Sequence, residues 1–297
     1  MVKETVLIVG LGEIGHTLFA LYGEAKEKFS VYGLDLDVQK MKLLNQSKDK
    51  VPAKVDTLQV CLPCSSQEKF ADTIKGYVHQ YKPKLTIINS TVPSGTTLKV
   101  AAACTCLVAH SPARGVHINA EHMIWEMKRW TKYVGGADAA ASKAAKVHFK
   151  NMGLKVKVLK SCHETELAKL FETTYRAWMI TCFQEMHRIS RAFDSDFDEA
   201  VDFIEDTHKE RFDRPVMFPG VIGGHCLIQN TELLLKSYDS ELLRLILKSN
   251  EKRKEEIKDP TVKAEADKVA VRAIALEKQL AGPKNVMLGE KNPAECS

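Results

Sequence analysis

The sequence predicts an α/β fold, in which a doubly wound parallel sheet is followed by an all-helical domain. Strand and helix patterns alternate over roughly the first 160 residues, a glycine-rich turn follows the first strand pattern, and strand patterns stop beyond that point. We therefore expect a Rossmann domain over residues 1–160 and a helical domain of the central, dimerisation type over 161–281. The residues at 282–297 are expected to form a loosely ordered tail.

The strands of the predicted sheet are short apolar runs that alternate with helical stretches. The helical periodicity between them is clearest at 14–27 and 138–151. Alternation of this kind is typical of a parallel sheet that helices cover on both faces. The predicted strands are Thr5–Val9, Ser30–Leu34, Thr57–Leu62, Leu85–Asn89, Cys106–Ala109, Tyr133–Gly135 and Lys155–Leu159.

The rest of the chain is predicted to be helical. Its first helix carries apolar residues over a wide arc, so we expect it to be buried against several neighbours. Pro260 is expected to separate the last two helices, because proline is favoured in a first helical turn and breaks an interior. The helices are predicted at 164–193, 198–208, about 231–258 and 260–280.

Composition and charge exclude several classes of protein. The 297 residues are 44% hydrophobic and 27% charged, which is typical of a globular protein. The formal net charge of +5 is not the clustered basic footprint of a nucleic-acid binder. No apolar run is long enough to span a bilayer, and the N-terminus lacks the pattern of a signal peptide. We therefore predict a cytoplasmic protein that binds neither nucleic acid nor membrane.

The eight cysteines are expected to be reduced thiols, because the chain has no secretory signal. Cys61 and Cys64, like Cys104 and Cys106, are spaced as metal or redox pairs can be. No matching set of His and Cys surrounds them at zinc spacing, and both pairs border apolar runs. We interpret them as core thiols and predict no metal site.

The glycine-rich turn predicts a dinucleotide site. Gly10, Gly12 and Gly15 allow a tight turn, the close approach of a pyrophosphate, and close packing of the first helix on the first strand. Asp35 ends the second strand, where a carboxylate binds the adenosine ribose hydroxyls and repels a 2′-phosphate. NAD is therefore the predicted cofactor, rather than NADP. The cofactor-binding candidates are Gly10, Gly12, Glu13, Ile14, Gly15 and Asp35.

Several segments resemble the UDP-glucose/GDP-mannose (nucleotide-sugar) dehydrogenase family, and they occur in the family's order. The resemblance implies the oxidation of a nucleotide sugar's primary alcohol with NAD and without a metal. Besides the glycine fingerprint, the segments are NSTVPSGTT at 89–97, SPAR at 111–114, ELAKLFETTYR at 166–176 and PGVIGGHC at 219–226.

The resemblance implies that Cys226, Lys169 and Thr91 are catalytic. Cys226 matches the family's nucleophile; a thiolate that adds to an aldehyde gives a thiohemiacetal, whose oxidation yields a thioester. Lys169 matches the catalytic lysine, whose ammonium stabilises an alkoxide. Thr91 matches a threonine near the hydrolytic water. Two roles stay open for Cys226, which either forms the covalent intermediate or lines the pocket.

Three positions depart from the family pattern. The family's acid is Ala113 here, its asparagine four residues after the lysine is Thr173, and its aspartate four residues after the cysteine is Asn230. Thr173 and Asn230 stay substrate-binding candidates, as does Arg214, where relatives place a basic residue. Since a general base is worth about 10²–10⁴ in rate, the departures favour a two-electron oxidation and leave open whether catalysis survives.

Members of this family normally have a second Rossmann-like domain that binds the nucleotide, whereas the residues after Cys226 are predicted to form helices. We expect this chain to lack that domain unless a partner supplies it. The predicted architecture also resembles β-hydroxyacid dehydrogenases. The alternatives to a nucleotide-sugar or other alcohol dehydrogenase are therefore an enzyme of that kind with a small substrate, and a non-catalytic NAD-binding protein. A homodimer is expected, since relatives dimerise through the equivalent helices.

Overall fold

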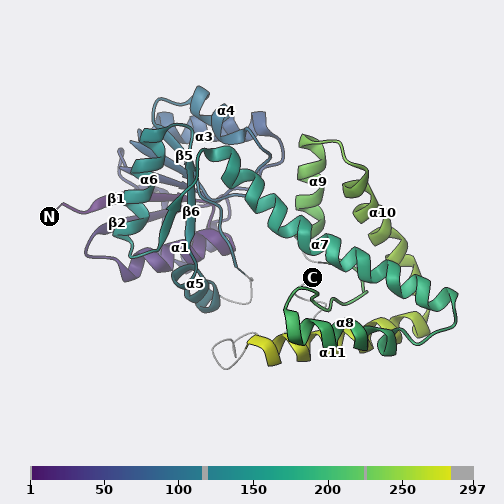
Figure 1. Cartoon of the computed structure of the whole chain (residues 1–297). Helices are drawn as coiled ribbons and strands as arrows, with labels where there is room; N and C mark the ends of the chain where they lie inside the picture. Colours follow the sequence, from purple (N-terminus) through teal and green to yellow (C-terminus); the bar gives the residue numbers. More distant parts are fainter. Residues whose placement is uncertain (1, 116–119, 224–225, 282–297) are drawn as a thin grey trace. The chain divides into compact units, whose positions relative to one another are not determined.

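A computed structural model describes residues 2–115, 120–223 and 226–281 of the chain (Figure 1). These residues form two compact units that divide between Lys169 and Leu170. The predicted tail at 282–297 lies outside the described residues, as do Gly224 and His225 of the PGVIGGHC segment.

The first unit contains a seven-stranded sheet with the order β2-β1-β3-β4-β5-β6-β7. Neighbouring strands are parallel, except for β5 and β6. The predicted parallel sheet is confirmed with this one exception, at which the chain re-enters the sheet from the edge where β5 ends. All seven strands are confirmed: β1 (Glu4–Val9), β2 (Phe29–Leu34), β3 (Thr57–Val60), β4 (Leu85–Ile88), β5 (Leu107–His110), β6 (Lys132–Gly136) and β7 (Val156–Val158).

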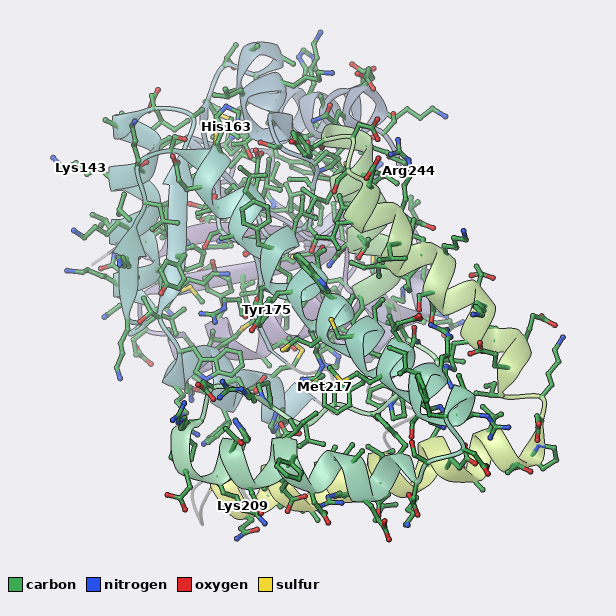
Figure 2. All side chains as sticks on the ribbon, turned by 45° about the vertical axis from the view of Figure 1, so that its right-hand side comes forward. Lys143, His163, Tyr175, Lys209, Met217 and Arg244 are labelled. Atoms are coloured by element: carbon green, nitrogen blue, oxygen red, sulfur yellow. The ribbon has the colours of Figure 1, made fainter. Side chains whose placement is uncertain are left out.

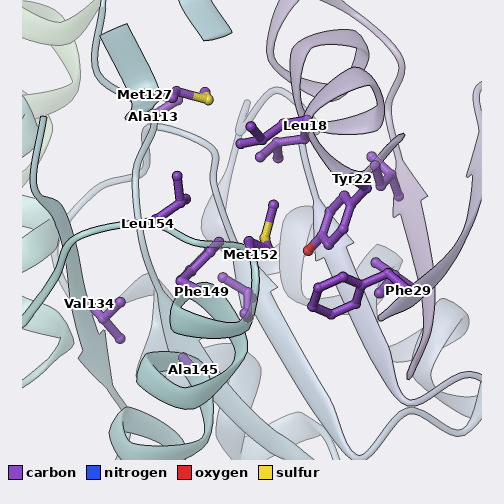
Figure 3. Packing of buried hydrophobic residues seen from close by; sticks show 14 of the residues in the cluster. Leu18, Tyr22, Phe29, Ala113, Met127, Val134, Ala145, Phe149, Met152 and Leu154 are labelled. Atoms are coloured by element: carbon purple, nitrogen blue, oxygen red, sulfur yellow. The ribbon is translucent and has the colours of Figure 1, made fainter. Parts of the chain in front are cut away.

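Helices cover both faces of this sheet, as predicted. Successive side chains of a strand point to opposite faces, so Val6 and Ile8 of β1 pack with α1, α5 and α6 (Figure 3). Leu7 and Val9 pack with α3 and α4 on the other face. The helices are α1 (Glu13–Glu24), α2 (Val38–Leu43), α3 (Gln67–Tyr81), α4 (Thr96–Ala103), α5 (Ala120–Arg129) and α6 (Ala139–Asn151), with a 3-10 helix at Lys48–Lys50.

Short polar side chains cap α2, α3 and α6, whereas α1 has no such cap. Ser66 and Asp138 cap α3 and α6 by accepting hydrogen bonds from backbone N–H groups of the first turn. The N-cap of α1 is Gly12, which offers no side chain to its first turn. The N–H groups at the start of α1 therefore lack this internal acceptor.

The second unit is helical, as predicted, although one predicted helix is wrong. The expected helix at 231–258 is split in two, because Ser240 caps a new helix by accepting a hydrogen bond from the backbone N–H of Leu243. The helix that starts at Pro260 is confirmed. The helices are α7 (Cys162–Ala192), which begins in the first unit, α8 (Phe197–Arg211), α9 (Leu227–Ser237), α10 (Glu241–Glu256) and α11 (Pro260–Ala281).

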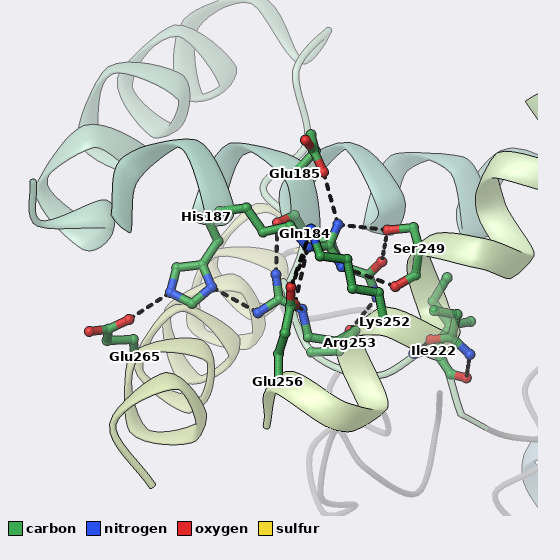
Figure 4. Close-up of polar contacts among 12 residues, drawn as sticks. Gln184, Glu185, His187, Ile222, Ser249, Lys252, Arg253, Glu256 and Glu265 are labelled. Carbon is green, nitrogen blue, oxygen red and sulfur yellow. Dashed lines mark hydrogen bonds and ion pairs between the residues drawn. The ribbon is translucent and has the colours of Figure 1, made fainter. Parts of the chain in front are cut away.

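A buried arginine ties three helices of the second unit together (Figure 4). Arg253 of α10 is 1% exposed and donates hydrogen bonds to the Gln184 carbonyl and to His187 Nδ1 of α7. His187 Nε2 lies 2.8 Å from Glu265 Oε2 of α11. Burial lowers the pKa of Arg253 to about 10, against the opposing charge of Glu256. These contacts connect α7, α10 and α11 within the helical unit.

One face of α7 is exposed, which corrects our expectation that the helix is buried over a wide arc. Leu170, Ala177 and Ile180 are buried, whereas Tyr175 is 61% exposed (Figure 2). The exposed residues recur every three or four positions and therefore share one side of the helix. We call this the α7 apolar face; it comprises Phe171, Tyr175, Trp178, Cys182, Met186 and Ile189, and Phe193 follows directly after the helix.

Candidate active site

The turn between β1 and α1 has the geometry of a dinucleotide-binding turn. Gly10 has a φ of 87°, and a Cβ there would lie 2.4 Å from the Cys61 carbonyl oxygen. A Cβ at Gly15 would lie 1.8 Å from the Gly10 carbonyl oxygen, whereas the Cβ position at Gly12 has no atom within 4 Å. The turn is therefore closed around Gly10 and Gly15 and open at Gly12, where α1 begins.

Asp35 lies beside the same turn. Its Oδ2 accepts a hydrogen bond of 2.6 Å from the backbone N–H of Leu11, and its Oδ1 accepts one of 2.8 Å from that of Asp37. These donors fix a half-buried carboxylate at the end of β2. Glu13 and Ile14 form the first turn of α1 next to it. The structure thus brings all six cofactor-binding candidates together.

The position of this turn in the sheet is that of a ligand site in open α/β proteins. The strand order reverses between β1 and β3, and ligands of such sheets bind at the carboxyl ends of the strands at this point. Gly10 follows β1 and Cys61 follows β3. Open space at Gly12, uncapped N–H groups and an oriented carboxylate fit the pyrophosphate and the ribose of a dinucleotide.

A buried lysine lies at the same edge of the sheet, beyond β4 and β5. Lys132 Nζ donates hydrogen bonds to the carbonyls of Ser111 (2.8 Å) and Pro112 (3.2 Å) and to Asn89 Oδ1 (3.4 Å). It also lies 5.1 Å from the centre of the Phe149 ring. Burial lowers the pKa of Lys132 to about 7, an effect that Cys61 opposes. The lysine is therefore near its titration midpoint at neutral pH.

His110, at the end of β5, is fully buried next to this lysine. Its Nε2 lies 3.1 Å from the Ser90 carbonyl, and its Nδ1 lies 2.9 Å from Thr165 Oγ1. Burial lowers the pKa of His110 to about 3; the Ser90 carbonyl opposes the shift, and the charges of Lys132 and Lys169 add to it. The imidazole is therefore neutral at pH 7 and donates Nε2–H to Ser90.

Glu166 joins the start of α7 to the loop that holds Thr91. Its carboxylate is 0% exposed and accepts hydrogen bonds of 2.7 Å from the backbone N–H groups of Gly95 and Thr97. Burial raises the pKa of Glu166, although these bonds oppose the shift. Lys169 follows Glu166 within one turn of the helix, so this contact fixes the Thr91 loop and the base of Lys169 within the first unit.

Three predicted residues lie together in the second unit. Cys226 is exposed and is the N-cap of α9. The backbone N–H of Asn230 donates to the Cys226 carbonyl at 2.9 Å, and its Nδ2 donates to Thr173 Oγ1 at 3.1 Å. Asn230 is 4% exposed. The hydroxyl of Thr173 and the amide of Asn230 thus connect α7 with the helix that begins at Cys226.

Arg214 and Ala113 do not join these groups. Arg214 is exposed and pairs with the neighbouring Asp213, at 2.7 Å from its Oδ1. Ala113 is buried at 6% exposure, and its backbone N–H donates to the Asn89 carbonyl at 3.3 Å. The predicted site is also divided along the chain, because Lys169 and Thr91 belong to the first unit and Cys226 belongs to the second.

Lys132, Glu166 and the role of His110 in this cluster were not predicted from the sequence. Lys132 carries a signal that could have been used, because a charged residue stands in a strand pattern next to Tyr133 and Val134. Burial of such a residue implies polar partners. Glu166 carries no such signal, since its partners are backbone groups about 70 residues away in sequence.

Other expected features concern metals, membranes and thiols. In the part of the chain that the structure describes, no cluster of three or more His, Cys, Asp or Glu could hold a metal ion. No described helix has the length and apolar character to cross a bilayer. The seven described cysteines are free thiols, and the four that we expected in the core are partly buried.

The comparisons with known proteins confirm the family resemblance. Residues 163–252 match the model of the UDP-glucose/GDP-mannose dehydrogenase family, central domain. A UDP-N-acetyl-D-mannosamine dehydrogenase of Methanocaldococcus jannaschii is 25% identical in an alignment of 289 positions that covers 84% of this chain and 66% of the relative. A second, from Pyrococcus horikoshii, is 25% identical over 73% of this chain. The chain spans 66% and 54% of the lengths of these relatives.

The comparison of structures confirms the fold. The UDP-N-acetyl-mannosamine dehydrogenase of Staphylococcus aureus superposes with a TM-score of 0.69 at 20% identity, over 87% of this chain and 70% of that chain. A 3-hydroxyisobutyrate dehydrogenase of Mycobacterium tuberculosis superposes with a TM-score of 0.64 at 16% identity, over 87% and 95%. Both are similar to this chain in fold.

Proposed function

We propose that this chain is an NAD-dependent oxidoreductase that oxidises a CH–OH group of a nucleotide sugar. The observation that carries the proposal is the turn at Gly10, Gly12 and Gly15 with the Asp35 carboxylate fixed beside it. The match of residues 163–252 supports the substrate class, since that family and the curated relatives are named as nucleotide-sugar dehydrogenases.

The proposed cofactor, NAD, would supply a hydride acceptor for the substrate carbon. The N-terminus of α1 at Gly12 would hold the pyrophosphate, and Asp35 would accept hydrogen bonds from the ribose hydroxyls. Because Asp35 is a carboxylate and would repel a 2′-phosphate, NAD is bound in preference to NADP.

Lys169 is proposed to stabilise the substrate oxygen. As the alcohol loses its proton and its carbon loses a hydride, negative charge develops on this oxygen and is stabilised by the ammonium. The charge of Lys169 acts on both His110 and Lys132 and helps to lower their pKa values, so its ammonium lies near this end of the first unit. Thr91, in the loop tied to α7 by Glu166, is proposed to bind the substrate or a water molecule.

The proposed reaction stops after one hydride transfer. A second oxidation would require the Cys226 thiolate to add to the aldehyde carbon while the carbonyl oxygen gains a proton. The thiohemiacetal would then have to lose this proton and a hydride, for which a second NAD would be the acceptor, and water would cleave the resulting thioester to release the acid and the thiol. Ala113 and Asn230 offer no carboxylate for these proton transfers. We therefore propose a non-covalent role for Cys226 and keep Thr173, Asn230 and Arg214 as proposed substrate-binding residues.

The test is NADH formation by the purified full chain with a panel of UDP- and GDP-sugars. We expect one NADH per substrate oxidised, loss of turnover in Lys169→Ala, and turnover retained in Cys226→Ser. Two NADH per substrate, with loss in Cys226→Ser, would replace this proposal by the four-electron reaction. Tight NAD binding without turnover of any alcohol would indicate a non-catalytic NAD-binding protein.

A second candidate function is oxidation of a small hydroxy acid. It is favoured by the superposition with 3-hydroxyisobutyrate dehydrogenase, which extends over 95% of that chain. Thermal-shift screening of hydroxy acids and nucleotide sugars, each with NAD present, separates the two substrate classes. Stabilisation by a nucleotide sugar alone supports the first candidate, and stabilisation by a hydroxy acid alone supports the second.

We also propose that the chain forms a homodimer. The α7 apolar face presents Tyr175 and Trp178, which are 61% and 41% exposed, on one side of the helix. An exposed apolar surface of this length is typical of a protein interface. We propose that a second copy of this chain binds to this face.

The location of the protein is proposed from its thiols. The free thiols of the described residues favour a reducing, cytoplasmic location.

A further inference from the structure

We propose that Lys132 is a positioning residue of the cofactor site and that its ammonium form is the one that holds the site in its binding geometry. This inference rests on the proposed NAD site. It goes beyond it by assigning a role to a buried lysine that does not lie in any of the segments with family resemblance.

The contacts of Lys132 join the ends of two strands. Asn89 follows β4, and Ser111 and Pro112 follow β5, so the three oxygens around Nζ belong to two separate strand exits. Asn89 is followed directly by Ser90 and Thr91, which begin the loop of the proposed site. The ammonium therefore links the Thr91 loop to the exit of β5.

The charge state of Lys132 decides whether all three oxygens can be satisfied. An ammonium has three N–H donors, whereas a neutral amine has two. Loss of the proton leaves one of Asn89, Ser111 and Pro112 without its donor. An unsatisfied buried acceptor is unfavourable, so one of the two strand exits is held less firmly in the neutral form.

A buried chain of hydrogen bonds continues from Asn89 through the core. Asn89 Nδ2 donates to Gln59 Oε1 (2.7 Å), and Gln59 Nε2 donates to the Tyr22 hydroxyl (2.7 Å). The Tyr22 hydroxyl lies 2.5 Å from His148 Nε2, and His148 Nδ1 lies 2.7 Å from Glu4 Oε1. The chain thus connects the carboxyl edge of the sheet with Glu4 at the start of β1.

In every hydrogen bond of this series, the group nearer Lys132 can be the donor. The ammonium donates to Asn89, and the Asn89 and Gln59 amides donate onward to Tyr22. In one tautomer of His148, Nε2 accepts from Tyr22 and Nδ1 donates to Glu4. Burial, followed by the charge of Glu4, raises the pKa of Tyr22, so its hydroxyl keeps the proton that it donates. A cation at one end and a carboxylate at the other polarise the bonds in one sense. The Asn89 amide is therefore held in a single orientation.

Among Lys132, Cys61 and His110, only Lys132 has a pKa near neutral pH. Cys61, after β3, has its pKa raised by burial to about 12, and His110 of β5 has its pKa lowered by burial to about 3. The charge of Lys169 on α7 adds to the effect of burial on Lys132. The packed residue of α6 is Phe149, which does not titrate.

The experiment measures the affinity of the full chain for NADH between pH 6 and 8.5, in the wild type and in two variants. Lys132→Met removes the donors, and Lys132→Arg keeps a cation that does not titrate in this range. Lys157→Met, an exposed lysine on the neighbouring strand β7, is the matched control. Circular dichroism and thermal unfolding verify that each variant is folded.

We expect the wild-type affinity to fall about tenfold from pH 6 to 8.5, because the ammonium form is lost. Lys132→Met should be about tenfold weaker than the wild type at pH 6 and independent of pH. Lys132→Arg should keep the affinity of the wild type at pH 6 and lose its pH dependence. The control should follow the wild-type curve.

A wild-type affinity that is flat over this range overturns the inference, even if neither variant folds. The same holds if Lys132→Met follows the wild-type curve. A wild type that does not bind NADH at any pH contradicts the proposed function instead. The two failures are therefore distinguishable from the wild-type curve alone.

Discussion

Asn230 Nδ2 donates a hydrogen bond to Thr173 Oγ1 at 3.1 Å and so joins α9 to α7 within the helical unit. Both residues stand where the family pattern has other side chains, an asparagine at 173 and an aspartate at 230. The replacements form a neutral pair in which an amide donates to a hydroxyl. The pair keeps the connection between the helices and the position of Cys226 at the start of α9, but it supplies no carboxylate as proton acceptor.

The first prediction concerns Asp35. Asp35→Ala removes the carboxylate that we assign to the ribose hydroxyls, and a hydrogen bond to a charged group is worth about 1.5–3 kcal/mol. We expect NADH affinity to fall by at least about tenfold and NADPH affinity to rise, since the repulsion of the 2′-phosphate is removed. Fluorescence titration with both cofactors measures this. Asp49→Ala, at an exposed site, is the control, and an unchanged preference for NADH in Asp35→Ala would contradict the role.

Two glycines of α1 provide the second prediction. Gly15→Ala would place a Cβ 1.8 Å from the Gly10 carbonyl oxygen, so the backbone of the turn must move. Gly23→Ala meets no atom within 4 Å, and alanine stabilises a helix interior by roughly 0.5–1 kcal/mol. We expect lower stability and loss of NADH binding in Gly15→Ala, and equal or higher stability with unchanged binding in Gly23→Ala. Equal binding by both variants would show that the turn does not hold the cofactor.

The third prediction concerns stability and pH. Burial lowers the pKa of Lys132 from 10.5 to about 7 in the folded chain, so between these values the unfolded chain binds more protons. The contribution of Lys132 to the free energy of unfolding therefore rises with pH from about 7 to 10.5, by up to about 1.4 kcal/mol per pH unit. Below pH 7 both states are protonated, and this contribution is constant.

Chemical denaturation of the wild type and Lys132→Met, at several pH values, isolates this contribution as a difference. The difference should increase with pH in favour of the wild type above pH 7. Lys157→Met should give a difference that does not depend on pH. A constant difference between the wild type and Lys132→Met from pH 6 to 9 would mean that the lysine does not titrate in this range.

The α7 apolar face gives the fourth prediction. Trp178→Glu introduces a charge at the centre of the proposed interface, and an unpaired buried charge is strongly unfavourable. We expect the wild type to sediment as a dimer and Trp178→Glu to sediment as a monomer at the same concentration. Lys143→Glu, on an exposed position of α6, should leave the dimer intact (Figure 2). A wild type that is monomeric at all concentrations would contradict the assignment of a second copy to this face.

The sequence allowed the sheet and the cofactor turn to be predicted, because both depend on local patterns. Each strand is an apolar run, and the requirement for glycine at positions 10 and 15 arises from neighbours that are close in the fold and common to such turns. The antiparallel pairing of β5 and β6 has no local signal. The division of the expected helix at 231–258 had one, since Ser240 is a favourable N-cap residue.

The exposure of the α7 apolar face and the contacts of Lys132 could not be predicted from the sequence. Periodicity predicted that this helix carries apolar residues over a wide arc, but it does not say whether another part of the chain covers Phe171, Tyr175 and Trp178. Similarly, the contacts of Lys132 with Asn89 and Ser111 join residues more than 20 positions apart. Such contacts depend on how strands are ordered in the sheet.

The measurement that tests the central claim most directly is NADH formation from NAD and nucleotide sugars by the wild type and by Lys169→Ala. The account predicts substrate-dependent NADH formation by the wild type and a loss of at least about 10²-fold in Lys169→Ala, because the stabilisation of the substrate oxygen is removed. NADH binding should be retained in the variant. Equal turnover by the two proteins would contradict the account.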